Sequence, residues 1–132
     1  MIGLDTNVLV RYITQDDPAQ CKAAAHLLEK TCSEESPGHI NLIVLCELVW
    51  VLEDVYAYSK AQIAGTLEHL LRSRELRVQS SERAWAAWRG YRAGRADFAD
   101  VLIAAINDAE GCSVTYTFDK KASAAAGFKL LT

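Results

Sequence analysis

Several common signatures of catalysis and targeting are missing from this chain of 132 residues. It contains no G-x-x-x-x-G-K-[ST] or G-x-G-x-x-G loop to cradle a nucleotide, and no nucleophile elbow. No run of about 18 apolar residues predicts a membrane span. Asp5 and Arg11 break the first apolar stretch, so no secretory signal pattern is visible. We therefore expect a soluble, cytoplasmic protein whose chemistry rests on other residues.

Cysteine and histidine are also too scattered to predict a zinc site or a disulfide framework. The chain has no C-x-x-C pair and no histidine cluster near a cysteine. We interpret the cysteines as reduced, mostly buried thiols. The histidines lie outside the acidic motifs, so we expect no catalytic role for them. The residues concerned are Cys21, Cys32, Cys46, Cys112, His26, His39 and His69.

Size and composition favour one globular domain over residues 1–132, since 51% of the residues are hydrophobic. The net charge of -3 is unevenly spread, because the segment from Arg72 to Arg95 holds seven arginines against Glu75 and Glu82. This arginine-rich segment is either a solvated helical face or a surface that attracts a polyanion, and the run alone favours neither. Arg89, Arg92 and Arg95 are its candidates for RNA binding.

Predicted strands and helices alternate along the chain. Strands are expected at residues 1–5, 39–41, 76–78, 113–118 and 128–131, and helices at 6–12, 18–30, 42–56, 60–71, 82–91, 97–110 and 120–126. Asp17, Ser59 and Asp97 stand at expected helix starts, and Gly111 at a helix end. Strands separated by helices imply a mainly parallel sheet covered on both faces, a three-layer α/β/α sandwich.

Four carboxylates stand where an acidic side chain is unexpected. Asp5 and Asp119 each follow a predicted strand, and the carboxyl ends of parallel strands are where α/β sheets bind ligands. Glu47 interrupts an apolar run in which an unpaired buried carboxylate would cost several kcal/mol. Asp100 lies near a predicted helix start. Together they favour one acidic, metal-binding pocket.

Each aspartate also has a purely structural interpretation. Asp5 and Asp119 could cap the helices that follow them, and Asp97 and Asp100 have the spacing of an N-cap and the third helical residue. Taken singly, capping is about as probable as catalysis. Glu47 has no such alternative, because it lies within a helix, and the joint pattern therefore favours a metal site.

Clustered carboxylates suit Mg²⁺ or Mn²⁺, which prefer oxygen ligands and keep several bound waters. Such ions can lower the pKa of a water and stabilise a departing oxygen in an in-line displacement. Hydrolysis of a phosphodiester is the natural reaction.

The motifs as a whole resemble the PIN domain, in particular VapC-type toxins of toxin-antitoxin modules, over essentially the full length. The resemblance rests on Leu4-Asp5-Thr6-Asn7, on Leu45-Cys46-Glu47-Leu48, on the block from Asp97 to Ala105, and on Thr117-Phe118-Asp119. It implies a Mg²⁺- or Mn²⁺-dependent endoribonuclease, homodimeric and held inactive by a small antitoxin. In that family Asp5, Glu47, Asp100 and Asp119 would match the metal-binding acids, and Asp97 an additional acid. Asn7 and Thr117 match positions that typically hydrogen-bond the acids.

Two interpretations from different classes remain. In the first, RNA enters along the arginine-rich segment and is cleaved. Trp85 and Trp88 could then stack on its bases, although core or dimer-interface packing is the more probable role for both. In the second, the chain is a non-catalytic module that binds RNA or protein and keeps the acids as a structural Mg²⁺ site.

Overall fold

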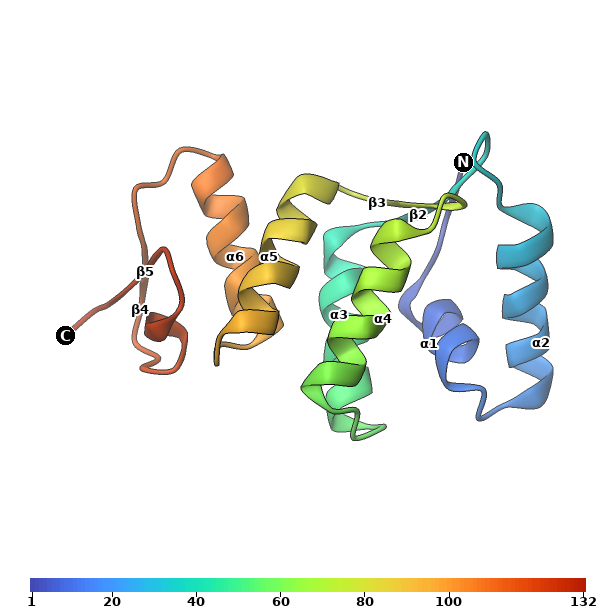
Figure 1. The fold of residues 1–132 in the computed structure, drawn as a ribbon, viewed down its shortest axis with the longest axis horizontal. Helices are drawn as coiled ribbons and strands as arrows, with labels where there is room; N and C mark the ends of the chain where they lie inside the picture. The colour runs from blue at the N-terminus through green and yellow to red at the C-terminus, as the bar shows by residue number, and fades with distance from the viewer. The chain divides into compact units, whose positions relative to one another are not determined.

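The computed structural model describes all of residues 1–132, which divide into two compact units, Met1–Gln79 and Ser80–Thr132 (Figure 1). The expected single domain over residues 1–132 stays a prediction.

Unit 1 contains a three-stranded parallel sheet. Its strands are β1 (Ile2–Gly3), β2 (Gly38–Ile40) and β3 (Leu76–Val78), in the order β1-β2-β3. Ile2 pairs with Gly38, and Gly38 in turn with Leu76. A Cβ atom on Gly38 would come 2.7 Å from the Leu4 side chain. Glycine at this position therefore lets Leu4, which is buried, pack against the strand that leads into α3.

The helices of unit 1 begin where the sequence predicts. They are α1 (Thr6–Thr14), α2 (Pro18–His26), α3 (Leu42–Asp54) and α4 (Lys60–Arg72), and α2 continues into a π-helical turn, η1 (Leu27–Thr31). Asp17 caps α2 through the Gln20 amide, and Ser59 forms a reciprocal capping box with Gln62 on α4. Both predicted caps are confirmed.

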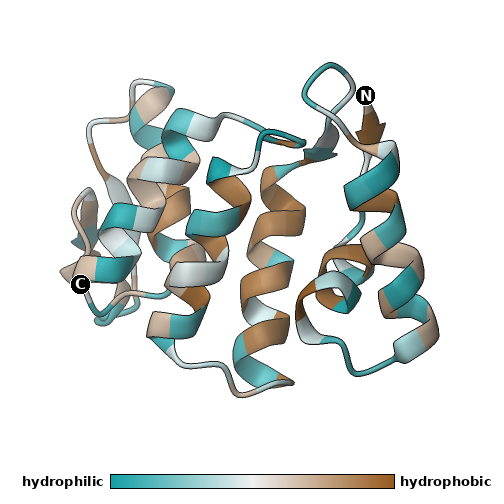
Figure 2. Ribbon diagram, turned by 45° about the vertical axis from the view of Figure 1, so that its right-hand side comes forward, coloured by the Kyte–Doolittle hydropathy of each residue, from teal (hydrophilic) through white to brown (hydrophobic).

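The core of unit 1 comes mainly from α3 and α4 with α1 and β2. Leu9, Ile40, Leu45, Leu48, Leu52, Ile63, Leu67 and Leu70 are almost wholly buried. Figure 2 shows α3 as a largely apolar helix. Burying a leucine or isoleucine side chain stabilises a fold by about 1.5–3 kcal/mol, so this cluster fixes the helix that carries Glu47.

Unit 2 contains the helices α5 (Ser81–Ala93) and α6 (Phe98–Ala109), the parallel strands β4 (Thr115–Thr117) and β5 (Phe128–Leu130), and a 3-10 turn, η2 (Ala122–Ala124). The two helices pack on each other, and Tyr91 meets Phe98 edge to face with ring centroids 5.7 Å apart. Gly90 faces Val101 of α6, and a Cβ there would lie 3.6 Å from the Val101 side chain, an ordinary contact distance. The start of α6, which carries Asp97 and Asp100, is thereby anchored.

The six α-helices and exclusively parallel strand pairs confirm the predicted α/β class with a parallel sheet. Three strands are shorter than predicted: the first ends at Gly3 and not at residue 5, the fourth spans three residues, and the fifth ends at Leu130 and not at residue 131. The third spans Leu76–Val78, as predicted. The helix predicted at 120–126 is only the turn η2. Gly111, with φ of 95°, follows the last residues of α6, as its role in ending the helix requires. No helix is long and apolar enough to cross a membrane.

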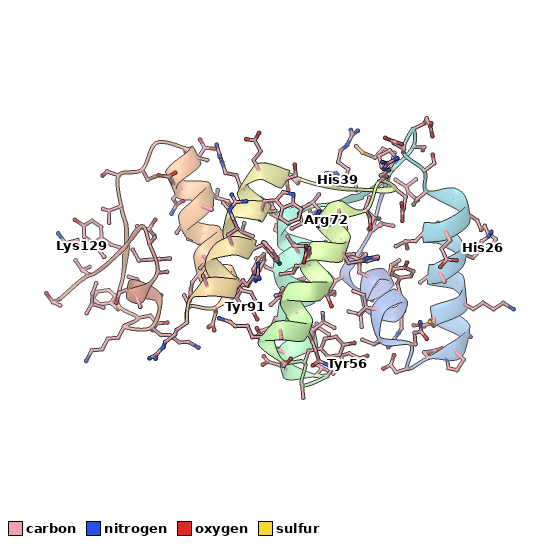
Figure 3. All side chains as sticks on the ribbon, in the orientation of Figure 1. His26, His39, Tyr56, Arg72, Tyr91 and Lys129 are labelled. Carbon is pink, nitrogen blue, oxygen red and sulfur yellow. The ribbon has the colours of Figure 1, made fainter.

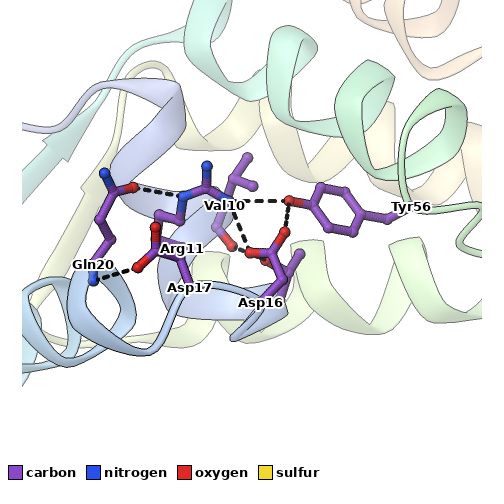
Figure 4. A network of polar contacts seen from close by, with 7 residues as sticks. Val10, Arg11, Asp16, Asp17, Gln20 and Tyr56 are labelled. Carbon is purple, nitrogen blue, oxygen red and sulfur yellow. Dashed lines mark hydrogen bonds and ion pairs between the residues drawn. The ribbon is translucent and has the colours of Figure 1, made fainter.

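A polar network joins the α1–α2 connection to the end of α3 (Figure 4). Asp16 accepts hydrogen bonds from the Tyr56 hydroxyl at 2.5 Å and from the Arg11 guanidinium at 2.8 Å. Arg11 also donates to Gln20 at 2.7 Å. The hydrogen bond from Tyr56, followed by those from Thr14 and Arg11, lowers the pKa of Asp16. The charged form of Asp16 is thus favoured by folding.

This network makes one part of the stability pH-dependent. Because folding lowers the pKa of Asp16 below its ordinary 3.8, its contribution is present above that value and is lost as the pH falls through the folded pKa. We expect Tyr56→Phe to lower the melting temperature at pH 7, and the difference from the parent to shrink below about pH 3. If the melting temperatures of variant and parent differ equally at both pH values, the effect of Tyr56→Phe comes from packing of the ring and not from the hydrogen bond to Asp16.

Candidate active site

Glu47 is exposed, and the prediction that it lies in an apolar environment is wrong. The run around it is apolar, but the helical period of α3 turns residues 43, 47 and 50 toward solvent. Ile43 is 74% exposed and Trp50 61%, whereas Leu45 and Leu48 are buried. No charged residue of the chain is buried. Glu47 therefore needs no compensating cation to be tolerated, and its position is informative because the carboxylate is accessible.

Thr6, the first residue of α1, hydrogen-bonds both candidate site acids of unit 1, Asp5 and Glu47. Its backbone amide donates to Asp5 Oδ1 at 2.7 Å, and its hydroxyl donates to Glu47 Oε1 at 2.7 Å. Asp5 is the N-cap residue of α1, so its carboxylate does serve the helix start. Each bond engages one oxygen of its carboxylate. One residue thus holds together two acids that are 42 positions apart in the sequence.

The role of Thr6 was missed in the sequence, where Asn7 was expected to support the acids. The signal was present, because a threonine directly after a strand-end aspartate carries both an amide and a hydroxyl donor. Asn7 is exposed on α1, and its supporting role stays a prediction. Asp5 and Glu47 share Thr6 as a hydrogen-bond partner, and their predicted role in one metal site stays a prediction.

The acids of unit 2 lie within electrostatic reach of one another. Asp100, in the first turn of α6, is half-buried, and burial is the main cause that raises its pKa. The charges of Asp97 and Asp119 raise it further, and Lys121 partly offsets them. Carboxylates that share a site disfavour one another's charged forms. This part of the site therefore favours an added cation.

Asp97 occupies the N-cap position of α6, but its side chain makes no capping hydrogen bond. Its Oδ1 instead lies 3.0 Å from the Lys121 ammonium. The interpretation of Asp97 as a side-chain helix cap is therefore corrected, because its carboxylate forms an ion pair with Lys121 instead.

Asp119 is held by its own turn. Its Oδ1 accepts from the Lys121 amide at 2.9 Å, and its amide donates to the Thr117 hydroxyl at 3.0 Å. Thr117 thus hydrogen-bonds the backbone of Asp119. That it also hydrogen-bonds the acidic side chains stays a prediction. The Asp119 contact is an Asx-type turn rather than a helix cap. It leaves the exposed carboxylate at the end of β4.

These carboxylates fit a hard divalent cation by their chemistry, because all are oxygen donors and four of the five are exposed. Neither unit by itself gathers three or more acidic, histidine or cysteine side chains into a ready metal site. The residues that could hold Mg²⁺ or Mn²⁺ are Asp5 and Glu47 in unit 1, and Asp97, Asp100 and Asp119 in unit 2.

The cysteines, His26, the two tryptophans and the arginine-rich segment complete the residues that the sequence analysis singled out. All four cysteines are free, as predicted, but only Cys32 is buried, and Cys112 is exposed. His26 points away from the body of unit 1, and Figure 3 shows it on the outside of α2. Trp88 is 9% exposed and meets Trp85 edge to face at 5.3 Å, which supports packing over base stacking for Trp88. The arginine-rich segment is not one helical face, since it runs from α4 through β3 into α5.

Arg89, Arg92 and Arg95 are all exposed in unit 2. The Arg92 guanidinium lies 5.2 Å from the centroid of the Trp88 ring. Stacking on an aromatic ring orients a guanidinium without neutralising it, so the charge remains available to an anion.

The family model described as the PIN domain matches residues 2–128, which include both units and all five acids. No curated protein matches the chain. The match covers nearly the whole sequence, so the chain belongs to the PIN domain family. PIN domains are in general metal-dependent nucleases, and the fold is therefore that of a nuclease acting on nucleic acid.

Proposed function

We propose that this protein is an endoribonuclease that uses Mg²⁺ or Mn²⁺ to hydrolyse RNA phosphodiester bonds, and that its two units form one nuclease domain. Asp5, Glu47, Asp100 and Asp119 are the catalytic acids of a single site. The observation that carries the proposal is that one residue in each unit contacts two of the acids: Thr6 hydrogen-bonds Asp5 and Glu47, and Lys121 contacts Asp97 and Asp119. The family match extends across both sets.

The residues themselves have distinct roles in this proposal. Thr6 orients Asp5 and Glu47, because both its donors are committed to them. The turn at Asp119 fixes the carboxylate after β4, and Asp100 supplies a half-buried acid in the first turn of α6. A bound divalent ion would supply an activated water and charge neutralisation at the phosphate. Asp97 is an additional acid for the same ion.

The biological setting we propose is that of a toxin in a toxin-antitoxin module, with a homodimer as the working form. The support is the sequence resemblance, which extends from Leu4 to Asp119. A short open reading frame for a basic DNA-binding protein beside the gene would be its cognate antitoxin.

The cleavage assay also separates the enzyme from a non-catalytic module with a structural ion. We expect purified protein to cut structured RNA with Mg²⁺ or Mn²⁺, and both EDTA and Asp5→Asn to abolish cleavage. A protein that binds RNA and Mg²⁺ without cutting would be the binding module. Cleavage that persists in EDTA would contradict both.

Neutralising Arg89, Arg92 and Arg95 to glutamine is expected to weaken RNA binding while leaving metal affinity intact, because these side chains would contact phosphate. Each phosphate contact contributes about 0.7 to the slope of log affinity against log salt for single strands, so the slope should fall by up to about 2. Lys22, Lys30 and Lys129, all exposed, provide a charge-matched triple control. Equal slopes for the two triple variants would mean that the arginines are a solvated face.

A further inference from the structure

Lys121 is the one cation that contacts two acids of unit 2. Its ammonium lies 3.0 Å from Asp97 Oδ1, and its backbone amide donates to Asp119 Oδ1 at 2.9 Å. Asp97 precedes α6 and Asp119 follows β4, so the contacts join segments 22 residues apart. Asp100 senses the charges of all three. Lys121 thus sits among the acids at which a metal would bind.

We propose that Lys121 is a built-in counter-cation, which neutralises the acids of unit 2 in the metal-free protein and competes with the divalent ion for Asp97. The proposal rests on the proposed function in one respect, that these acids bind a metal. It assigns to Lys121 a control of metal affinity that the acids alone would not provide.

The ion pair is suited to exchange, because both partners are largely exposed, at 57% for Lys121 and 59% for Asp97. Exposed ion pairs contribute little to stability, so an incoming ion meets a weak competitor. An ammonium offers only donors and cannot share a coordination shell with a metal, and its charge repels the ion. Metal binding and the Lys121 contact to Asp97 must therefore weaken each other by the same factor.

Two effects of removing the ammonium oppose each other. Loss of the contact to Asp97 frees that carboxylate to move, which disfavours metal binding, but an exposed pair constrains it only weakly. Loss of a positive charge near a divalent ion favours binding by roughly three- to tenfold even with the screening of water. The amide that holds Asp119 belongs to the backbone and remains in every variant. Competition therefore outweighs positioning, and metal affinity should rise.

The test is a calorimetric titration of Mn²⁺ into the full chain at pH 7, in parallel with RNA cleavage. We expect Lys121→Gln to bind Mn²⁺ roughly three- to tenfold more tightly than the parent, and to melt at a lower temperature without metal. Lys121→Arg, which keeps the charge, should restore both values toward the parent. Lys120→Gln is the matched control, since it removes the same charge from the exposed neighbour.

The outcomes separate this proposal from the proposed function. A parent that binds Mn²⁺ and cuts RNA, with equal Mn²⁺ affinity in Lys121→Gln and Lys120→Gln, would overturn only the role of Lys121. Weaker binding in Lys121→Gln would make it a positioning residue and overturn the competition. A parent that binds no Mn²⁺ would overturn the proposed function and this inference together.

Discussion

Replacing Glu47 by glutamine is expected to slow RNA cleavage at least about a hundredfold, because in the proposed site the change removes a charge that binds the metal. Glutamine has the same shape, and its carbonyl oxygen can still accept the Thr6 hydrogen bond. The side chain is exposed on α3, so the core beneath it is untouched. The loss should therefore appear in cleavage rate and Mn²⁺ affinity rather than in melting temperature.

Asp54→Asn is the matched control for Glu47→Gln. It removes the same charge from another exposed position on α3, and we expect it to cleave RNA at the parental rate. If Glu47→Gln cleaves as fast as Asp54→Asn, Glu47 has no part in the chemistry.

Asp100→Asn is expected to abolish most activity and yet to melt at the same temperature as the metal-free parent or higher, by roughly 2–5 °C. The reason is the raised pKa of Asp100, which burial and the charges of Asp97 and Asp119 produce. A folded pKa above the ordinary 3.8 costs stability as the pH rises between the two values, and the full cost persists at pH 7. The negative charge of Asp100 in the first turn of α6 also interacts favourably with the helix dipole. Losing this interaction offsets part of the stability that Asp100→Asn gains.

Saturating Mg²⁺ should reverse the order of the two melting temperatures, because the parent gains binding free energy that the variant has largely lost. Four melting curves at pH 7 give the comparison. A variant that is clearly destabilised without metal, together with no Mg²⁺ shift in either protein, would make Asp100 a residue of the helix start only.

Much of the fold was predictable because local signals agreed with it. Proline after Asp17, the serine and glutamine of the Ser59 box, and the apolar period of α4 each indicate a helix start or face through interactions within one turn. The strands were less predictable in length. Strand ends depend on pairing with distant segments. The apolar run at the start of the chain continues to Leu4, whereas the pairing of β1 with β2 ends at Gly3.

The candidate site was predictable as a set of residue types but not as a set of contacts. A run of apolar residues around Glu47 does not show which side of α3 meets the core, and the structure turns this acid outward. Nor can spacing show that the Asp97 side chain contacts Lys121 rather than capping α6, since the two residues are 24 positions apart. Hydrogen bonds between remote segments, such as that from Thr6 to Glu47, exist only once the fold is formed.

The central claim is that the acids of the two units act on one metal site, and a double-mutant cycle in Mn²⁺ affinity tests it most directly. Asp5→Asn removes an acid of unit 1 and Asp119→Asn one of unit 2. If the two acids share an ion, each single variant should bind Mn²⁺ more weakly than the parent. The loss of binding free energy in the double variant should then be much smaller than the sum of the two single losses. Two single losses that simply add in the double variant would mean that Asp5 and Asp119 bind Mn²⁺ at independent sites. That result would contradict the claim.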